Sequence, residues 1–191
     1  MKATNILCVM TAALVCALAA TSHAADSNTE KKRNDVRTTA QDTLQRLYKA
    51  DPKAKAAVEN AAGYAAFSNL GVKILVAGSG NGQGIAINNK SKKETFMKML
   101  EVQAGFGMGV KKFRVVFVFD NERAFNSFVN SGWQFGGQAT AAAKTTADQG
   151  GAMAGAASVS DGVWMYQLTD KGLALEITAK STKYYKDDDL N

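Results

Sequence analysis

The sequence predicts an α+β fold, in which an N-terminal helical arm packs on a curved, mainly antiparallel and barrel-like β-sheet of about eight to ten strands. Glycine divides the chain, since all 17 glycines lie at Gly63 or later. Residues 26–62 are rich in charged residues and helix formers, whereas alternating apolar patterns follow Gly63. Alternation with a period of two is typical of strands, and the glycine-free segment is typical of helix.

The first 24 residues have the layout of a secretory signal peptide. Lys2 precedes an apolar run over 6–20, and Ser22 and Ala24 supply small residues at the −3 and −1 positions of a cleavage site. We therefore expect a signal peptide at 1–24, a helical arm at 25–62 and a β-rich body at 63–191, with arm and body forming one domain. The expected location is export, to the periplasm or envelope or as a secreted protein.

Cleavage after Ala24 would remove whole classes of chemistry. Both cysteines, Cys8 and Cys16, and the single histidine, His23, lie in the predicted signal peptide. What remains has no thiol nucleophile, no imidazole base and no Cys or His zinc ligand. We predict no cofactor, no metal site and no enzymatic activity. A hydrolase based on paired carboxylates is the least favoured alternative, since no recognisable motif surrounds the acidic residues.

The arm contains two helical patterns. Val36, Ala40, Leu44 and Leu47 recur at spacings of four, four and three, which places them on one helix face. After Asp51-Pro52, a second face consists of small residues, namely Ala54, Ala57, Val58 and Ala61. Packing on the domain's own sheet is the favoured interpretation. The alternative is a helix lying on a membrane, with Lys31, Lys32, Arg33 and Arg37 at the headgroups.

In the body, glycines suggest two turns. Strand 72–77 is followed by a glycine-rich run at 78–84, in which Asn81-Gly82 predicts a type I′ hairpin turn. The run lacks the spacing of a P-loop or a dinucleotide fingerprint. Apolar residues then occupy even positions over 105–110 and odd positions over 113–119, so a turn or bulge is expected at Lys111-Lys112. The strand over 113–119 is apolar on both faces and should be central.

The remaining elements are a short helix, further strands and a polar tail. Asp120 or Asn121 should cap a helix over 122–129. A strand is expected over 133–143, a loop or close-packed crossing over 149–162, and a hairpin from 163–168 and 173–179. Asp187 to Asp189 should form a solvated acidic end.

Two basic clusters are the candidate binding residues. They are Lys90, Lys92 and Lys93 in one, and Lys111, Lys112 and Arg114 in the other. Both fall at predicted turns or strand ends, and we expect them to converge on one end of the sheet as a patch for anionic headgroups. Ordinary turn lysines are the competing interpretation. The formal net charge of +6 is modest, and with export predicted, nucleic acid is not an expected partner.

The order of several short motifs resembles the SYLF domain family over roughly residues 36–191. These motifs include Ala62 to Phe67, Gln103 to Gly109, Asn121 to Phe128 and Val163 to Tyr166. The resemblance implies binding of lipid or membrane, since eukaryotic SYLF domains bind phosphoinositides and membranes and some associate with actin. The segment Lys93 to Met97 lacks the Trp and Pro of the eukaryotic pattern, and export makes phosphoinositides poor candidates.

Two functions follow as hypotheses. The first is an exported, non-enzymatic protein of the bacterial envelope that binds anionic lipid or membrane surface. The second is a protein-interaction or structural scaffold, whose partners would be envelope proteins.

Overall fold

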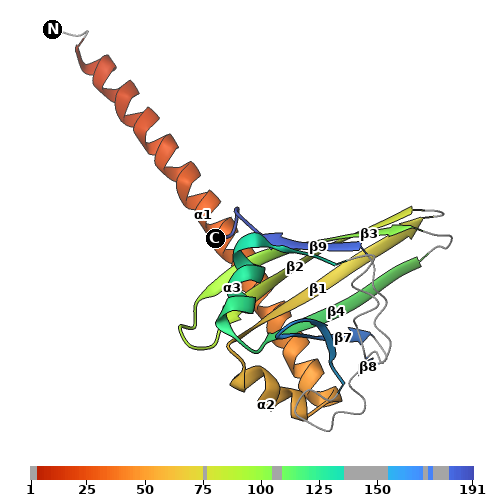
Figure 1. Cartoon of the computed structure of the whole chain (residues 1–191). Helices are drawn as coiled ribbons and strands as arrows, with labels where there is room; N and C mark the ends of the chain where they lie inside the picture. The colour runs from red at the N-terminus through yellow and green to blue at the C-terminus, as the bar shows by residue number, and fades with distance from the viewer. Residues whose placement is uncertain (1–3, 75–76, 105–108, 136–154, 170–171, 174–180) are drawn as a thin grey trace.

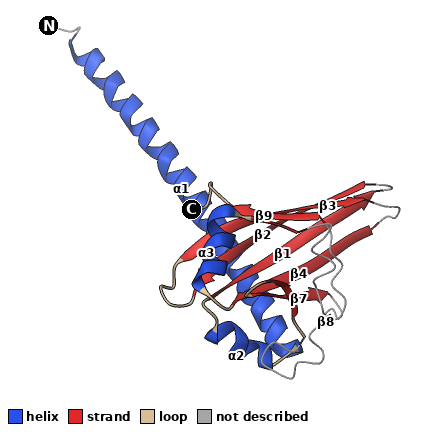
Figure 2. Cartoon of the chain, in the orientation of Figure 1, coloured by secondary structure: helices blue, strands red, loops and turns tan. Residues whose placement is uncertain are grey.

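The computed structural model describes residues 4–74, 77–104, 109–135, 155–169, 172–173 and 181–191 (Figures 1 and 2). Within these ranges, three helices accompany one sheet of nine strands. The helices are α1 (Thr4–Ala50), α2 (Lys53–Asn60) and α3 (Glu122–Ser131). The strands are β1 (Gly63–Ile74), β2 (Ala77–Asn88), β3 (Glu94–Ala104), β4 (Gly109–Phe119), β5 (Trp133–Phe135), β6 (Ala157–Ser160), β7 (Val163–Thr169), β8 (Gly172–Leu173) and β9 (Ser181–Lys186).

Every pair of described strands is antiparallel. The strand order is β5-β9-β3-β2-β1-β4-β7-β6, with β8 paired to β7. The sheet is strongly curled, and the path through its described strands runs from β5 to β6 as a half-barrel (Figure 1). The predicted α+β fold, with its curved antiparallel sheet, is confirmed.

One face of the sheet packs against α3 through an aromatic cluster. Asn121 caps α3 as predicted, because its side chain accepts a hydrogen bond from the Ala124 amide at 2.9 Å. The helix buries Phe125 and Phe128 against rings from four strands. Within this cluster, the Phe117 and Tyr184 ring centroids lie 5.0 Å apart in an edge-to-face arrangement, which aromatic quadrupoles favour.

The other face packs against α1 and α2. Val36, Ala40 and Leu47 of α1 are buried and Leu44 is partly buried, so the predicted helix face is the face in contact. They meet an apolar sheet surface made by Ala66, Ile85, Phe96, Val116, Val118 and Tyr166. The interpretation that the arm packs on the domain's own sheet is therefore confirmed. Figure 1 shows α1 continuing well beyond the sheet toward its N-terminal end.

The junction between the two helices lies close to its predicted position. Helix α2 begins at Lys53, whose amide donates to the Asp51 carboxylate at 3.0 Å. Ala54, Ala57 and Val58 are buried, as the small-residue face predicted. Within the part of the chain that the structure describes, no helix has a stretch that is both long and apolar enough to cross a membrane.

The glycine-rich run is a strand, so the hairpin turn predicted at Asn81-Gly82 is wrong. Asn81 pairs with Leu70 in the middle of the β1–β2 ladder, and the two strands connect through residues 75–76. Gly84 serves packing rather than turning. A Cβ on Gly84 would meet the Phe67 ring and the Ala66 carbonyl oxygen, so only glycine fits beneath this ring.

The turn or bulge predicted at Lys111-Lys112 is also wrong. Both residues lie inside β4, where Lys111 pairs with Gly71 and Lys112 with Leu70. The β1–β4 register runs without interruption from Gly63 opposite Phe119 to Lys73 opposite Gly109. The predicted strand over 113–119 is an interior strand, paired on both sides with β1 and β7.

The C-terminal predictions hold in part. The hairpin is present as β7 and β8, whereas residues 174–179 lie outside the described residues. The strand expected over 133–143 is described only as β5, and 136–143 lie outside. Residues 149–154 of the expected loop also lie outside, but 157–160 form strand β6, which pairs with β7.

The acidic tail is solvated only in part, since Asp188 and Asp189 are exposed as predicted but Asp187 is buried. Only 2% of the Asp187 side chain is exposed, and its carboxylate lies 2.8 Å from the Lys98 ammonium. Its amide donates to the Phe96 carbonyl at 3.0 Å, which extends the hydrogen bonding of β9 along β3. Asn191 then bonds to both the amide and the carbonyl of Phe96, so the tail is fixed to the sheet.

We expect Gly84→Ala to lower the free energy of unfolding by about 1–3 kcal/mol, because the added methyl group must displace a ring or a backbone carbonyl. Urea denaturation would measure the loss. Gln83→Ala is the matched control at the neighbouring, exposed position and should change stability by no more than about 0.5 kcal/mol. Equal stabilities for the two variants would contradict the packing role of Gly84.

Asp187→Ala should lower the free energy of unfolding by about 1–3 kcal/mol, since it removes a buried acceptor and leaves the partly buried Lys98 with one partner fewer. Asp188→Ala is the control, because Asp188 is the exposed neighbour in the same acidic run. If both substitutions had the same small effect in urea denaturation, the tail would be the solvated end that the sequence suggested.

Candidate functional site

The two predicted basic clusters lie far apart. Lys90, Lys92 and Lys93 follow β2 in its turn to β3, beside the sheet row in which Asn88 pairs with Gly63. Lys111 lies eight residues along β4 from Phe119, which also pairs with Gly63, so it is roughly 26 Å from that row at about 3.3 Å per residue. The prediction that the clusters converge on one end of the sheet is therefore wrong.

Arg114 does not reach outward as predicted. Its side chain is only 18% exposed and lies between β4 and α1, where one guanidinium nitrogen is 3.3 Å from the Asp42 carboxylate. The Nε atom is buried without a hydrogen-bond partner. The side chains of Lys111 and Lys112 lie outside those that the structure describes, so their part in binding stays a prediction.

The β2–β3 turn holds its lysines on a fixed backbone. The Asn88 side chain accepts hydrogen bonds from the amides of Lys90 at 3.0 Å and Ser91 at 2.8 Å. Lys92 has a φ of 58°, in the left-handed region that a tight turn uses. Asn89 donates to the Val58 carbonyl at 2.7 Å, which ties the turn to the end of α2. Lys90, Lys92 and Lys93 are all exposed on this turn.

A surface cavity of about 460 Å³ lies next to this turn. We call it the cationic hollow. Its lining combines α1, β3, α3, β9 and the C-terminal tail, through Glu30, Arg33, Arg37, Lys93, Glu94, Thr95, Phe96, Val129, Asn130, Lys186, Leu190 and Asn191. Four of these side chains are cations and two are carboxylates, so the hollow has an excess of positive charge.

The two carboxylates are already occupied by the two arginines. Arg37 lies 2.9 Å from both Glu94 and Glu30, and Arg33 lies 3.3 Å from Glu30. Hydrogen bonds from Arg37 and Arg33 accordingly lower the pKa of Glu30, and those from Glu30 and Glu94 raise the pKa of Arg37. The ammoniums of Lys93 and Lys186 form no ion pair with any described carboxylate, so they supply the unbalanced charge.

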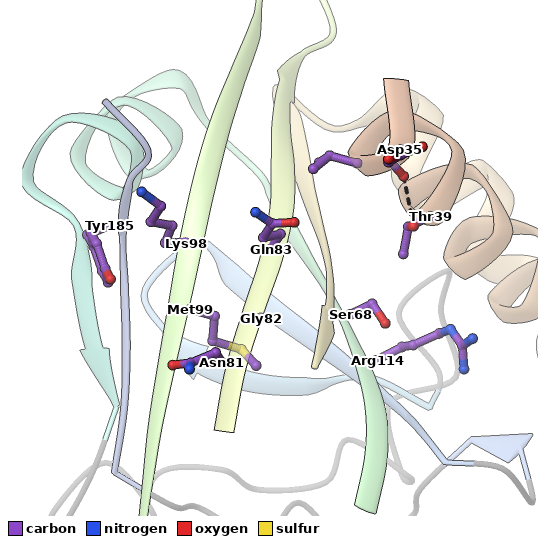
Figure 3. A pocket seen from close by; sticks show the side chains of 11 residues that line it. Asp35, Thr39, Ser68, Asn81, Gly82, Gln83, Lys98, Met99, Arg114 and Tyr185 are labelled. Carbon is purple, nitrogen blue, oxygen red and sulfur yellow. Dashed lines mark hydrogen bonds between the residues drawn. The ribbon is translucent and has the colours of Figure 1, made fainter. Parts of the chain in front are cut away.

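A second cavity of about 590 Å³ lies between α1 and the sheet, which we call the α1 groove (Figure 3). Asp35 and Thr39 of α1 form one side, and Ser68, Gln83 and Lys98 lie on the floor. The remaining lining residues are Val36, Asn81, Gly82, Met99, Arg114 and Tyr185.

The cation on the groove floor is paired with the C-terminal tail. Lys98 lies 2.8 Å from Asp187 and 2.7 Å from Asp189. These hydrogen bonds raise the pKa of Lys98, and the hydrogen bond from Lys98 lowers the pKa of Asp189. Lys98 is therefore a structural cation rather than one available to a ligand.

Sequence reasoning found Lys93 but missed the rest of the hollow. Lys186 enters it because β9 pairs with β3, which places Lys186 opposite Met97. Arg33 and Arg37 were named only for a helix lying on a membrane. No local spacing links these residues, since their proximity depends on strand order. In the described ranges there is no group of three or more His, Cys, Asp or Glu side chains that could hold a metal ion.

Comparison with known proteins identifies the family of the chain. Residues 100–191 match a family model described as Ysc84, a Las17-binding protein and actin regulator. The chain belongs to the SYLF (Ysc84) family. A relative named Beta cell expansion factor A, from Aeromonas veronii, is 32% identical over 162 residues. The match covers 84% of this chain and 59% of that relative. The family model confirms the resemblance to SYLF domains seen in the sequence.

The pairing of Lys98 makes stability depend on pH. Because Asp189 has a lowered pKa in the folded protein, its contribution is present above the ordinary aspartate pKa and is lost as pH falls through the lowered value. Lys98→Met removes the partner of both aspartates. We therefore expect the stability difference between wild type and Lys98→Met to shrink as pH is lowered from about 6 to about 3. A difference that stays constant in urea denaturation across this range would contradict the pairing.

Proposed function

We propose that this SYLF protein is an exported, non-enzymatic protein that binds anionic lipid headgroups at a membrane surface of the bacterial envelope. The observation that carries the proposal is the cationic hollow, where Lys93 and Lys186 present ammoniums that no described carboxylate neutralises. Lys90 and Lys92 extend the same positive surface along the β2–β3 turn. The lipid binding implied by the family resemblance supports this choice of ligand.

The arrangement suits a phosphate group at a membrane surface. Lysine ammoniums bind phosphate as point charges, and each basic residue near an anionic membrane contributes about 1 kcal/mol. Ion pairs with Glu30 and Glu94 hold the neighbouring arginines in place. A phosphate in the hollow would therefore lie beside cationic side chains that are already ordered. The Arg37 guanidinium also lies over the Phe96 ring, 5.2 Å from its centroid, which further restrains it.

The carboxylates with described partners support the non-enzymatic part of the proposal. Glu94 is paired with Arg37, and Asp120 accepts a hydrogen bond from the Trp164 indole at 2.8 Å. Asp161 is almost fully exposed and lies 3.7 Å from Arg123. A hydrolase of the paired-carboxylate kind needs two carboxyl groups facing each other across a cleft, roughly 5–9.5 Å apart. Glu94, Asp120 and Asp161 each interact with a different side chain instead.

The charge reversal Lys93→Glu with Lys186→Glu tests the hollow. We expect it to weaken partition onto vesicles of phosphatidylglycerol and phosphatidylcholine by about 2–4 kcal/mol at low salt, because each reversal replaces an attraction by a repulsion. Vesicle flotation would measure the partition. For the wild type, binding should also fall as salt increases, since the lysines are exposed.

Lys49→Glu with Lys53→Glu is the matched control, because it makes the same change in net charge at exposed lysines near the α1–α2 junction. The control should retain most of the binding. Lys111→Glu with Lys112→Glu tests the site predicted from sequence alone. If the control and the hollow variant lost the same amount of vesicle binding, the loss would be due to net charge and not to the hollow. No recovery of wild type on anionic vesicles at about 50 mM salt would overturn the proposal, because screening is mild there.

A further inference from the structure

We infer that the α1 groove is a second binding site, separate from the cationic hollow, and that its ligand is hydroxyl-rich and of carbohydrate type. The volume of about 590 Å³ lies in the range of small-molecule sites, which is about 300–1,000 Å³. The inference goes beyond the proposed binding of anionic headgroups, because the groove has a different chemistry from the hollow.

The groove floor is a continuous polar row across the sheet. The residues directly opposite one another in register are Arg114, Ser68, Gln83, Lys98 and Tyr185, contributed in turn by β4, β1, β2, β3 and β9. Residues in register on neighbouring strands point to the same face, and all five line the groove beneath α1. Figure 3 shows these side chains spread over that face.

The polar row begins where the apolar contact with α1 ends. Two residues along each strand, the corresponding row is Val116, Ala66, Ile85 and Phe96, and all four are buried with the α1 residues. If α1 simply covered the sheet, apolar residues would continue across this face. Instead, the side chains change from apolar to hydrogen-bonding at the position where the cavity opens. Small-molecule sites typically place a few polar groups in a cavity in this way.

The charges of the groove do not suit a simple anion. Arg114 is paired with Asp42, and Lys98 is paired with Asp187 and Asp189. Asp35 lies on the helix side of the groove, and it forms no ion pair with any cation in the described part of the chain. A phosphate or carboxylate ligand would gain little from cations that are already neutralised and would be repelled by Asp35.

The groove therefore offers donors on one side and an acceptor on the other. Arg114 lines the groove with a partly exposed side chain, and only its Nη2 atom lies within hydrogen-bond distance of a described carboxylate, that of Asp42. The Gln83 amide and the Ser68 hydroxyl lie in the same row, and Asp35 lines the groove from α1. A hydroxyl group both donates and accepts, so neighbouring hydroxyls of a sugar could satisfy both sides at once. The partly exposed Tyr185 ring adds an amphipathic surface at the edge.

The test is binding of soluble sugars to the full chain without lipid. Maltotriose and chitotriose would be titrated up to about 50 mM and followed by saturation-transfer NMR, which detects dissociation constants in the millimolar range. Flotation on neutral phosphatidylcholine vesicles containing diglucosyl diacylglycerol would test the same chemistry on a lipid. Saturable binding of a free trisaccharide would indicate a glycan source, and binding only to the glycolipid vesicles a membrane source. Either result supports the site.

Two variants locate the binding. Gln83→Ala and Asp35→Asn change exposed side chains of the groove, and each should weaken the interaction about tenfold. Gln41→Ala is the matched control, since Gln41 is exposed on α1 and is not part of the groove lining. Circular dichroism would verify that the variants are folded.

Three outcomes would overturn the inference. These are no saturable binding to either trisaccharide or to the glycolipid vesicles, binding that Gln83→Ala and Asp35→Asn leave unchanged, and displacement of a bound sugar by inorganic phosphate. None of them bears on the cationic hollow, because its test uses anionic vesicles without sugar and lysines that lie outside the groove.

Discussion

The rest of the structure depends on one constraint, which is that the second half of strand β4, residues 115–119, is apolar on both faces. Phe117 and Phe119 belong to the aromatic cluster under α3, whereas Val116 and Val118 belong to the cluster under α1. A sheet of this composition is stable only if both faces are removed from water. Helix α3 follows β4 almost at once along the chain, so it covers its face through a local connection. Helix α1 is remote from β4 in sequence, and its position depends on long-range contacts.

Those contacts explain why two distinct cavities lie beside α1. Burial of residues such as Leu47 supplies the attraction between α1 and the sheet, while exposed ion pairs add little energy of their own. The ion pairs instead restrict how the helix lies. Arg37 bonds to Glu94 at the start of β3, and Arg33 donates to the Leu190 carbonyl of the tail at 2.9 Å. These polar bonds hold α1 near Arg33 and Arg37, and the following turns of the helix pack on the apolar row of the sheet. The cationic hollow and the α1 groove are both lined by this part of α1.

Sequence patterns predicted the parts of the fold that depend on local chemistry. The spacing of Val36, Ala40 and Leu47 predicted the buried face of α1, and Asn121 is one of the two residues that were expected to cap α3. The turn predicted at Asn81-Gly82 is wrong, although Asn-Gly is a favoured pair in hairpin turns. A nearby glycine, Gly84, is needed because it lies beneath the Phe67 ring, and that contact exists only in the folded sheet. Most of the cationic hollow was missed for the same reason. Lys93 and Lys186 are distant in sequence and become neighbours only through the pairing of β9 with β3.

Ion pairing, rather than the number of basic residues, distinguishes the two cavities. The formal net charge of +6 identifies no surface, because many of the cations face a carboxylate. Lys98 and Arg114 line a groove, yet their charges are neutralised by aspartates from the tail and from α1. Their remaining capacity is for directed hydrogen bonds, which suits a neutral, hydroxyl-rich ligand. In the hollow the arginines occupy the carboxylates, and the lysines remain as unbalanced charge, which suits an anion. One sheet thus presents surfaces of two chemistries, separated by the line along which α1 packs.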